Sequence, residues 1–314
     1  MYSIGIDIGA TNTDIGLVRN DGAIIGRANL PTQSFEKADL YIAAIIEKIR
    51  ELLDSNDITA LDGIGIGAPN GNYLTGCIEA NTANLRIKER IPLGEVLGKA
   101  FHTNVKLDND ANAAALGEMV YGGAKGLQNF IMLTLGTGVG SGIVIDGKLL
   151  HGAHGAAGEL GHAIVNPNGR LCSCGRKGCI EMYASARGIC QNYREAVLTD
   201  GLPCSKSKEE LESVTCQFVG ESAVNGDKAA LKAYDVTAYW LGVALANAVA
   251  FSEPEAVFLM GGPTRAGEAL MAPLRKYFEE SLLFLYKGKI SLQLSQLKSN
   301  ESAILGAAAL STSI

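Results

Sequence analysis

The sequence predicts an α/β protein whose two similar halves face each other across a cleft. The main observation is an internal repeat. A strand, a glycine-rich turn, a second strand and an Asx-Gly turn occur at 2–22 and again at 131–147. The second observation is the composition: of 314 residues, 47% are hydrophobic and 19% charged, which suits a sizeable folded core. Together they indicate two ordered α/β domains.

The first half opens with an alternating strand at 2–8 and a turn at 7–13 that leads into a strand at 14–19. A hairpin turn at 20–22 then leads into a strand at 23–30. Small residues in the first turn would let backbone N–H groups approach phosphate oxygens, and Asp7 could hold magnesium through water. An ordinary hairpin is the alternative. The nucleotide candidates here are Asp7, Gly9, Ala10, Thr11, Asn12 and Thr13.

A strand-to-helix junction follows later in this half. An amphipathic helix at 37–55 and a strand at 61–68 come first, and Asn84 is a candidate ligand contact in a polar loop. A strand at 105–107 then feeds Asp108-Asn109-Asp110 and the helix at 111–121. These polar residues either cap the helix or take part in the reaction. We expect one of them to be the N-cap, which leaves another acid and Asn109 to project into the cleft.

The second half repeats the phosphate-type pattern. A strand at 131–135 precedes the turn at 136–142, which contains Thr137 and Gly138. Two such turns, one in each half, would grip a nucleotide from both sides. A third glycine pair, Gly261-Gly262, follows a buried-type strand at 256–260 and offers backbone against which a base or ribose could lie.

Residues from 184 onward are predicted to be mainly helical. The expected helices lie at 206–214, 227–251 and 264–283, followed by a strand at 289–294. A final helix at 301–310 is rich in alanine and other small residues, so it could pack tightly on a neighbour.

A metal-binding pattern lies within 151–181. Cys172, Cys174 and Cys179 are spaced C-x-C-x4-C, and His162 lies ten residues upstream. Three thiolates and one imidazole match the tetrahedral set that a structural zinc prefers, and four protein ligands leave no position for a catalytic water. Free cysteines and disulfides are the alternatives, although three is an odd number and nothing marks the chain as secreted.

Glu159 and Glu181 lie on either side of this metal pattern, so a bound metal would also fix both carboxylates. Each carboxylate accepts two hydrogen bonds and suits a polyhydroxylated ligand. The alternative is that both glutamates are solvated surface charges.

Charge and hydropathy exclude several classes of partner. A net charge of −6 argues against binding to a nucleic acid or to a membrane surface. The N-terminus lacks a signal-peptide pattern, and no stretch gives 18 uninterrupted apolar residues. We therefore expect a cytoplasmic protein without nucleic-acid or membrane partners.

Five segments resemble the signatures of the ROK family of sugar kinases and repressors, in the usual order: GIDIGATNTDIGLV, LDNDANAAALGE, LTLGTGVGSGIV, GAAGELGH and CSCGRKGCIE. Ala10 stands where glycine is usual, and Asn12 where lysine is frequent. The resemblance implies an actin-like (ribonuclease H-like) ATPase fold that closes over ATP and a hexose. It implies a small α/β domain, 1–112 plus 301–314, a large α/β domain, 113–300, and a homodimer.

The resemblance also implies roles for individual residues. Asp110 matches the catalytic base, and it joins Asn84, Asn109, Glu159, His162 and Glu181 as substrate-binding residues. The metal ligands would be His162, Cys172, Cys174 and Cys179, with His162 bridging zinc and sugar through its two ring nitrogens.

The implied function is an ATP- and Mg2+-dependent hexose kinase that phosphorylates the 6-hydroxyl of glucose. A kinase for N-acetylmannosamine, fructose or allose is the first alternative. A non-catalytic sugar-sensing regulator is the second. ROK repressors carry an N-terminal winged helix-turn-helix, and the first phosphate strand begins here at Tyr2, so we expect a kinase.

Overall fold

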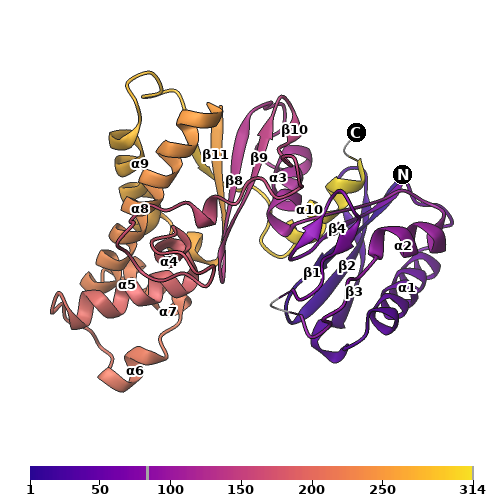
Figure 1. Ribbon diagram of the computed structural model, residues 1–314, viewed down its shortest axis with the longest axis horizontal. Helices are drawn as coiled ribbons and strands as arrows, with labels where there is room; N and C mark the ends of the chain where they lie inside the picture. Colours follow the sequence, from indigo (N-terminus) through magenta and orange to yellow (C-terminus); the bar gives the residue numbers. More distant parts are fainter. Residues whose placement is uncertain (83–84, 313–314) are drawn as a thin grey trace.

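The computed structural model describes residues 1–82 and 85–312, and it contains two five-stranded sheets with the same strand order (Figure 1). In each sheet three strands form an antiparallel meander, and two further strands lie parallel to the meander strand that comes first in the sequence. The predicted duplication is thereby confirmed. The first sheet is β3 (Ile24–Pro31), β2 (Asn12–Arg19), β1 (Tyr2–Ile8), β4 (Gly63–Gly67) and β7 (Val105–Asp108), and the second is β10 (Lys148–Leu149), β9 (Val139–Ile145), β8 (Phe130–Leu135), β11 (Ala256–Gly261) and β12 (Ser291–Leu294).

Helices cover the first sheet on both faces. α1 (Ala38–Ser55) buries Tyr41, Ile45 and Ile49 at helical spacing, and α2 (Leu93–Phe101) shares its core. The other face receives α10 (Ser302–Thr312). A short hairpin of β5 (Gly71–Asn72) and β6 (Cys77–Ile78) and the 3-10 turn η1 (Thr32–Ser34) complete this half.

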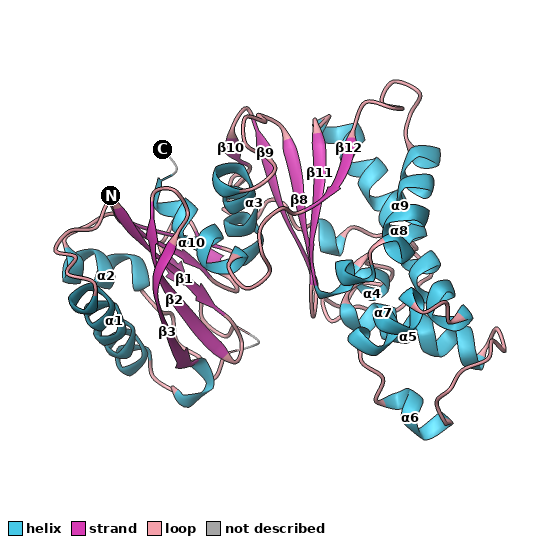
Figure 2. Ribbon diagram, turned by 180° about the vertical axis from the view of Figure 1, so that it is seen from behind, coloured by secondary structure: helices cyan, strands magenta, loops and turns pink. Residues whose placement is uncertain are grey.

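α10 packs closely on the first sheet, as its small residues predicted. A Cβ atom on Gly65 would lie 1.8 Å from the carbonyl oxygen of Ala307, so only glycine allows this approach. α10 also lies beside α3 (Asp110–Tyr121), which packs on β8 and β9. Both views show α3 and α10 between the two sheets (Figures 1 and 2). The proposed domain boundary at residue 112 falls in the first turn of α3.

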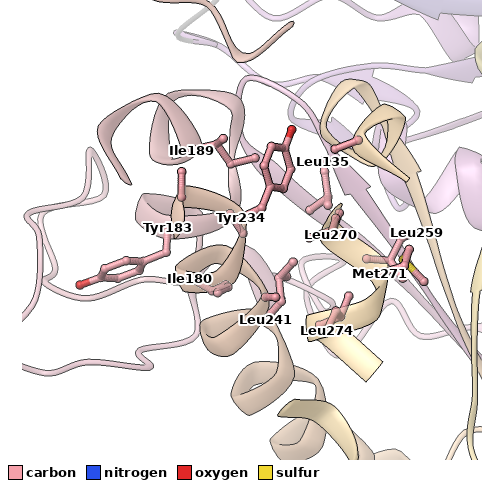
Figure 3. Packing of buried hydrophobic residues seen from close by; sticks show 14 of the residues in the cluster. Leu135, Ile180, Tyr183, Ile189, Tyr234, Leu241, Leu259, Leu270, Met271 and Leu274 are labelled. Atoms are coloured by element: carbon pink, nitrogen blue, oxygen red, sulfur yellow. The ribbon is translucent and has the colours of Figure 1, made fainter. Parts of the chain in front are cut away.

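The larger core lies under the helices of the second sheet. Tyr183, Tyr234, Leu241 and Leu274 belong to it, and they come from three helices that pack against one another (Figure 3). The helices are α4 (Glu181–Ala184), α5 (Ala186–Leu198), α7 (Cys216–Val224), α8 (Lys228–Ser252) and α9 (Glu268–Ser281). The short α6 (Lys208–Glu212) stands apart and begins with a capping box, Ser207 with Glu210.

Several boundaries differ from those predicted. The helix expected at 264–283 begins only at Glu268, because Gly267 has a φ of 57° and separates it from the 3-10 turn η3 (Gly262–Ala266). The helix α2 was not predicted at all. Across 1–82 and 85–312, no helix has both the length and the apolar character needed to cross a bilayer.

Candidate active site

A cavity of about 680 Å³ lies between residues of the two sheets. Its first side consists of 69–72, Glu79 and the junction at 109–111, and its second side comes from the glycine turns and the segment at 154–162. Ligands of α/β proteins bind at such strand ends. Nine residues predicted from sequence line this cavity: Asn109, Asp110, Thr137, Gly138, Glu159, His162, Glu181, Gly261 and Gly262.

The junction between β7 and α3 differs from our expectation in one respect. Asn109 is itself the N-cap of α3, and its side-chain oxygen accepts a hydrogen bond of 2.7 Å from the backbone N–H of Asn112. Its oxygen is therefore occupied, which leaves its amide N–H group for a ligand. Asp108 is buried, whereas Asp110 is exposed to the cavity.

Three carboxylates create a negative field at the ends of β1 and β7. The protein around Asp110 displaces solvent and raises the pKa of its carboxyl group, even though the side chain faces the cavity. Burial, Asp110 and Asp14 raise the pKa of Asp7 to about 7. A divalent cation would relieve this repulsion, and carboxylates are the ligands that magnesium prefers.

The first glycine turn does not line the cavity. Gly9 donates its backbone N–H to the carbonyl of Asn12 at 2.8 Å, and Ala10 and Thr11 are exposed. The side chain of Thr13, another nucleotide candidate, is buried. β2 begins at Asn12, so the alternation of the strand turns Thr13 inward, where its hydroxyl lies 2.5 Å from that of Tyr41.

The second glycine turn is held by the helices behind it. The backbone N–H of Ala186 donates to the carbonyl of Gly136 at 2.8 Å, and the N–H of Val139 donates to the carboxylate of Glu181 at 3.1 Å. Thr137 stays exposed at the tip of the turn. Glu181 is thus fixed at the wall of the cavity.

The segment that carries Glu159 and His162 rests directly on β9. A Cβ atom on Gly161 would lie 1.9 Å from the carbonyl oxygen of Val139, so glycine is required there. The hydroxyl of Ser141 accepts a hydrogen bond of 3.1 Å from the N–H of Leu160. These contacts hold both sugar-binding candidates on the second sheet.

The four predicted metal ligands lie together. Their donor atoms are all within 4.8 Å of one another. The Cys174 and Cys179 sulfurs are 3.6 Å apart, and the Cys172 sulfur is 3.7 Å from His162 Nδ1. A tetrahedral zinc with bonds of about 2.3 Å to sulfur places its ligands roughly 3.8 Å apart, so this donor set fits the ion.

The pKa values of the cysteine thiols also favour a bound cation at this site. The backbone and guanidinium of Arg176 lower the pKa of Cys174 to about 6. Burial and the neighbouring thiols raise the pKa of Cys179 to about 12. A zinc ion would deprotonate both thiols and remove this mutual repulsion. The Glu181 carboxylate lies 3.9 Å from the Cys172 sulfur, so the cluster adjoins the cavity.

A second cavity of about 440 Å³ shares Gly136 and Gly262 with the first. It lies between α7 and η3, and its polar and aromatic lining includes Glu221, Tyr234 and Arg265. The sequence pattern pointed to the glycine pair but not to these side chains, because helical residues at ordinary spacing carry no ligand signal.

Asn70 and Glu79 also line the cavity, and neither was predicted from the sequence. Asn70 follows the end of β4 in the turn 69–71, so the strand-end rule could have identified it. Asn84, a predicted sugar contact, lies outside the described residues.

Comparison with known proteins identifies the family. Residues 3–314 match the ROK family. The chain belongs to the ROK family. A glucokinase from Thermotoga maritima is 34% identical, over 98% of this chain and 96% of the relative. The crystal structure of a ROK family glucokinase from Streptomyces griseus in complex with glucose and AMPPNP is 30% identical, covers 99% of both chains and has a TM-score of 0.78.

A ROK family transcriptional regulator, described as a homologue of the E. coli MLC protein, is also similar. It is 25% identical and has a TM-score of 0.86, over 99% of this chain and 77% of the regulator. Both kinase and regulator therefore share the architecture of this ROK protein, which is an actin-like ATPase fold.

Proposed function

We propose that this ROK protein phosphorylates the 6-hydroxyl of glucose with ATP, and that Asp110 is the general base. The observation that carries the proposal is the position of Asp110. It lies at the start of α3 in the same cavity as Glu159, His162 and the second glycine turn. One cavity thus holds a base, hydroxyl-binding groups and a phosphate-type turn.

The broader class rests on the relatives. The protein is an ATP-dependent sugar kinase, a phosphotransferase with an alcohol acceptor, as its similarity to glucokinases over nearly the whole chain supports. The preference for glucose and the assignment of the base are the parts that we propose.

Two neighbouring cavities, which share the lining residues Gly136 and Gly262, suit the two substrates. The sugar and the phosphates would occupy the larger cavity, and adenosine the smaller one beside Tyr234 and Arg265. Glu159 and Glu181 would accept hydrogen bonds from sugar hydroxyls, and the free amide of Asn109 would donate one. In this arrangement the 6-hydroxyl would lie beside Asp110 and the γ-phosphate at the turn 136–140.

The reaction is then a direct transfer. Asp110 accepts the proton of the 6-hydroxyl while the oxygen of that hydroxyl attacks the γ-phosphorus. The bond between the γ-phosphorus and the oxygen of the departing ADP breaks. Magnesium near Asp7 would neutralise phosphate charge when bound. The raised pKa of Asp110 makes its carboxylate a better proton acceptor than a carboxylate with the ordinary pKa.

The test is turnover with magnesium and ATP over glucose, mannose, fructose, allose, N-acetylglucosamine and N-acetylmannosamine. We expect the highest kcat/KM for glucose. Preference for another sugar would replace the substrate but keep the mechanism. Sugar binding without turnover on any of them would instead favour a sensing role, which the similarity to a ROK regulator makes worth testing.

Asp110→Asn tests the base directly. Loss of the proton acceptor should lower kcat by about 10²–10⁴-fold. The dissociation constant for glucose should change little, because amide and carboxylate have similar size. Asp21→Asn, at the exposed tip between β2 and β3, is the control and should keep full activity. An equal loss of turnover and sugar binding in Asp110→Asn would contradict the assignment.

We also propose that His162, Cys172, Cys174 and Cys179 hold one structural zinc, which would fix the segment that carries Glu159 and Glu181.

A homodimer is the proposed assembly, and the mass of the protein in solution by light scattering tests it.

A further inference from the structure

Asp108, the last residue of β7, has a buried carboxylate that the neighbouring helix does not use as its cap. Its side chain is 1% exposed. Oδ1 accepts hydrogen bonds of 2.8 Å from the backbone N–H of Asn109 and from the side-chain amide of Asn112. Burial of an acid costs free energy unless hydrogen bonds or charges compensate for it. The helix does not need Asp108 as a cap, because Asn109 serves there.

The remaining oxygen of Asp108 reaches across to the other half of the molecule. Oδ2 lies 2.6 Å from Nε2 of His151, a residue that follows β10 at the edge of the second sheet. The His151 ring also stacks on Tyr73, with 4.0 Å between centroids and 14° between planes. Tyr73 belongs to the β5–β6 hairpin loop of the first half. His151 is therefore clamped between two first-domain residues.

Each end of this contact leads to one side of the cavity. Asp108 directly precedes Asn109 and Asp110, which line the first side. His151 opens the loop that leads to Glu159, and its carbonyl accepts a hydrogen bond of 3.0 Å from the N–H of Ala157 in that loop. The pair thus joins the strand end that carries the base to the segment that carries the hydroxyl-binding glutamate.

We infer that Asp108 and His151 are positioning residues, which fix Asn109 and Asp110 relative to the sugar-binding segment at 154–162. This inference rests on the proposed kinase function. Misplacement of a reacting group by about 1 Å can cost on the order of 10²-fold in rate. Neither side chain lines the cavity, so both act through their neighbours and not by touching the sugar.

The experiment compares two variants of His151. His151→Leu keeps much of the side-chain volume but removes the donor, and it should lower kcat by about 10–100-fold. The dissociation constant for glucose should stay within about threefold, because Glu159, His162 and Glu181 are untouched. His151→Gln retains an N–H donor toward Asp108 and should recover most of the lost kcat. His102→Asn, at the exposed end of α2, is the control and should behave as wild type.

A readout without turnover separates this inference from the kinase proposal. Hydrogen exchange over 105–115 should be at least about tenfold faster in His151→Leu, because the amide of Asn109 loses a fixed acceptor. Exchange outside 105–115 and the loop at 150–160, which carries the substitution, should not change. If wild type turns over none of the sugars, the kinase proposal fails and faster exchange still supports positioning of the loop.

Four results would overturn the inference. The first is an unchanged kcat in folded His151→Leu. The second is a His151→Gln variant as slow as His151→Leu. The third is unchanged exchange over 105–115. A loss of activity that only follows the folded fraction, measured by thermal unfolding, would assign His151 to stability and would also overturn it.

Discussion

Asp7 has a pKa near neutrality, at about 7, because it is buried near Asp110 and Asp14. An unfolded aspartate ionises near 3.8, so the folded protein binds this proton more tightly. Its contribution to stability is complete below pH 3.8 and is lost as the pH rises through about 7. Between pH 5 and pH 8 the penalty of the ionised side chain grows by about 2–3 kcal/mol.

Asp7→Asn should remove this penalty. Relative to wild type, its free energy of unfolding should rise by about 2–3 kcal/mol more at pH 8 than at pH 5, as chemical denaturation at the two values would show. The same variant should bind magnesium and ATP more weakly. Asp21→Asn is the control, because Arg19 holds the pKa of Asp21 at about 2 and nothing titrates there between pH 5 and pH 8. Parallel pH curves for Asp7→Asn and wild type would contradict the prediction.

At single positions, sequence identified residue types better than it did side-chain directions. Asp110, Glu159 and Glu181 line the cavity as predicted. Thr13 points inward because β2 begins two residues earlier than predicted and so includes it, and the Asn109 oxygen caps α3 because that helix begins one residue earlier than predicted. Such shifts are smaller than the accuracy with which a sequence defines element ends.

At the level of elements, α10 depends on glycine in the strands beneath it. Gly65→Ala would bring a methyl group within 1.8 Å of the Ala307 carbonyl, so either the helix or the strand must move. We expect a loss of about 2–4 kcal/mol in the free energy of unfolding. Gly98→Ala in α2 is the matched control. Its added methyl meets only ordinary contacts at 3.5 Å or more, so it should be neutral or slightly stabilising.

The loop at 171–179 should depend on its metal. Wild type is expected to contain one zinc per chain by elemental analysis, and Cys179→Ser should contain less. The variant should also unfold at a lower temperature, since ligand binding to the folded state alone adds to its stability. Cys77→Ser, at a buried cysteine of β6 that does not belong to the cluster, should retain its zinc. Equal zinc in both variants would contradict the ligand assignment.

Local patterns predicted the repeated elements well. Both strand-turn-strand units were recognisable because strand alternation and the Asx-Gly turns, such as 146–147, are encoded within a few residues. The helix α2 was missed because its nine residues include two glycines, which weaken the helical signal. Contacts with β6 and β7, which no local pattern reports, stabilise it instead.

At the level of the whole molecule, the proposed kinase function requires the first glycine turn to reach the nucleotide in the cavity. The turn at 9–13 would bind phosphate, yet it does not line the cavity that holds Asp110. We expect glucose together with AMPPNP to rotate the two halves toward each other, which would bring this turn onto the nucleotide. Small-angle X-ray scattering should then show a smaller radius of gyration. An unchanged radius with both ligands bound would contradict closure.

The smaller of the two cavities could not be predicted from the sequence. The smaller one is built from α7, α8 and η3, whose residues lie up to 50 positions apart and carry no shared motif. The glycine turns showed only that ligands bind near strand ends. Which helix faces each turn is decided by tertiary packing.

The position of α10 at the end of the chain also bears on how the protein is made. About 190 residues separate β7 from α10, so the first sheet leaves the ribosome long before the helix that covers it. At 5–20 residues per second this delay is roughly 10–40 s. During that time the nascent chain presents an uncovered face of β1 and β4. Chaperones that bind apolar segments of unfinished chains would therefore find their target on the first half of this protein, although that half is synthesised first.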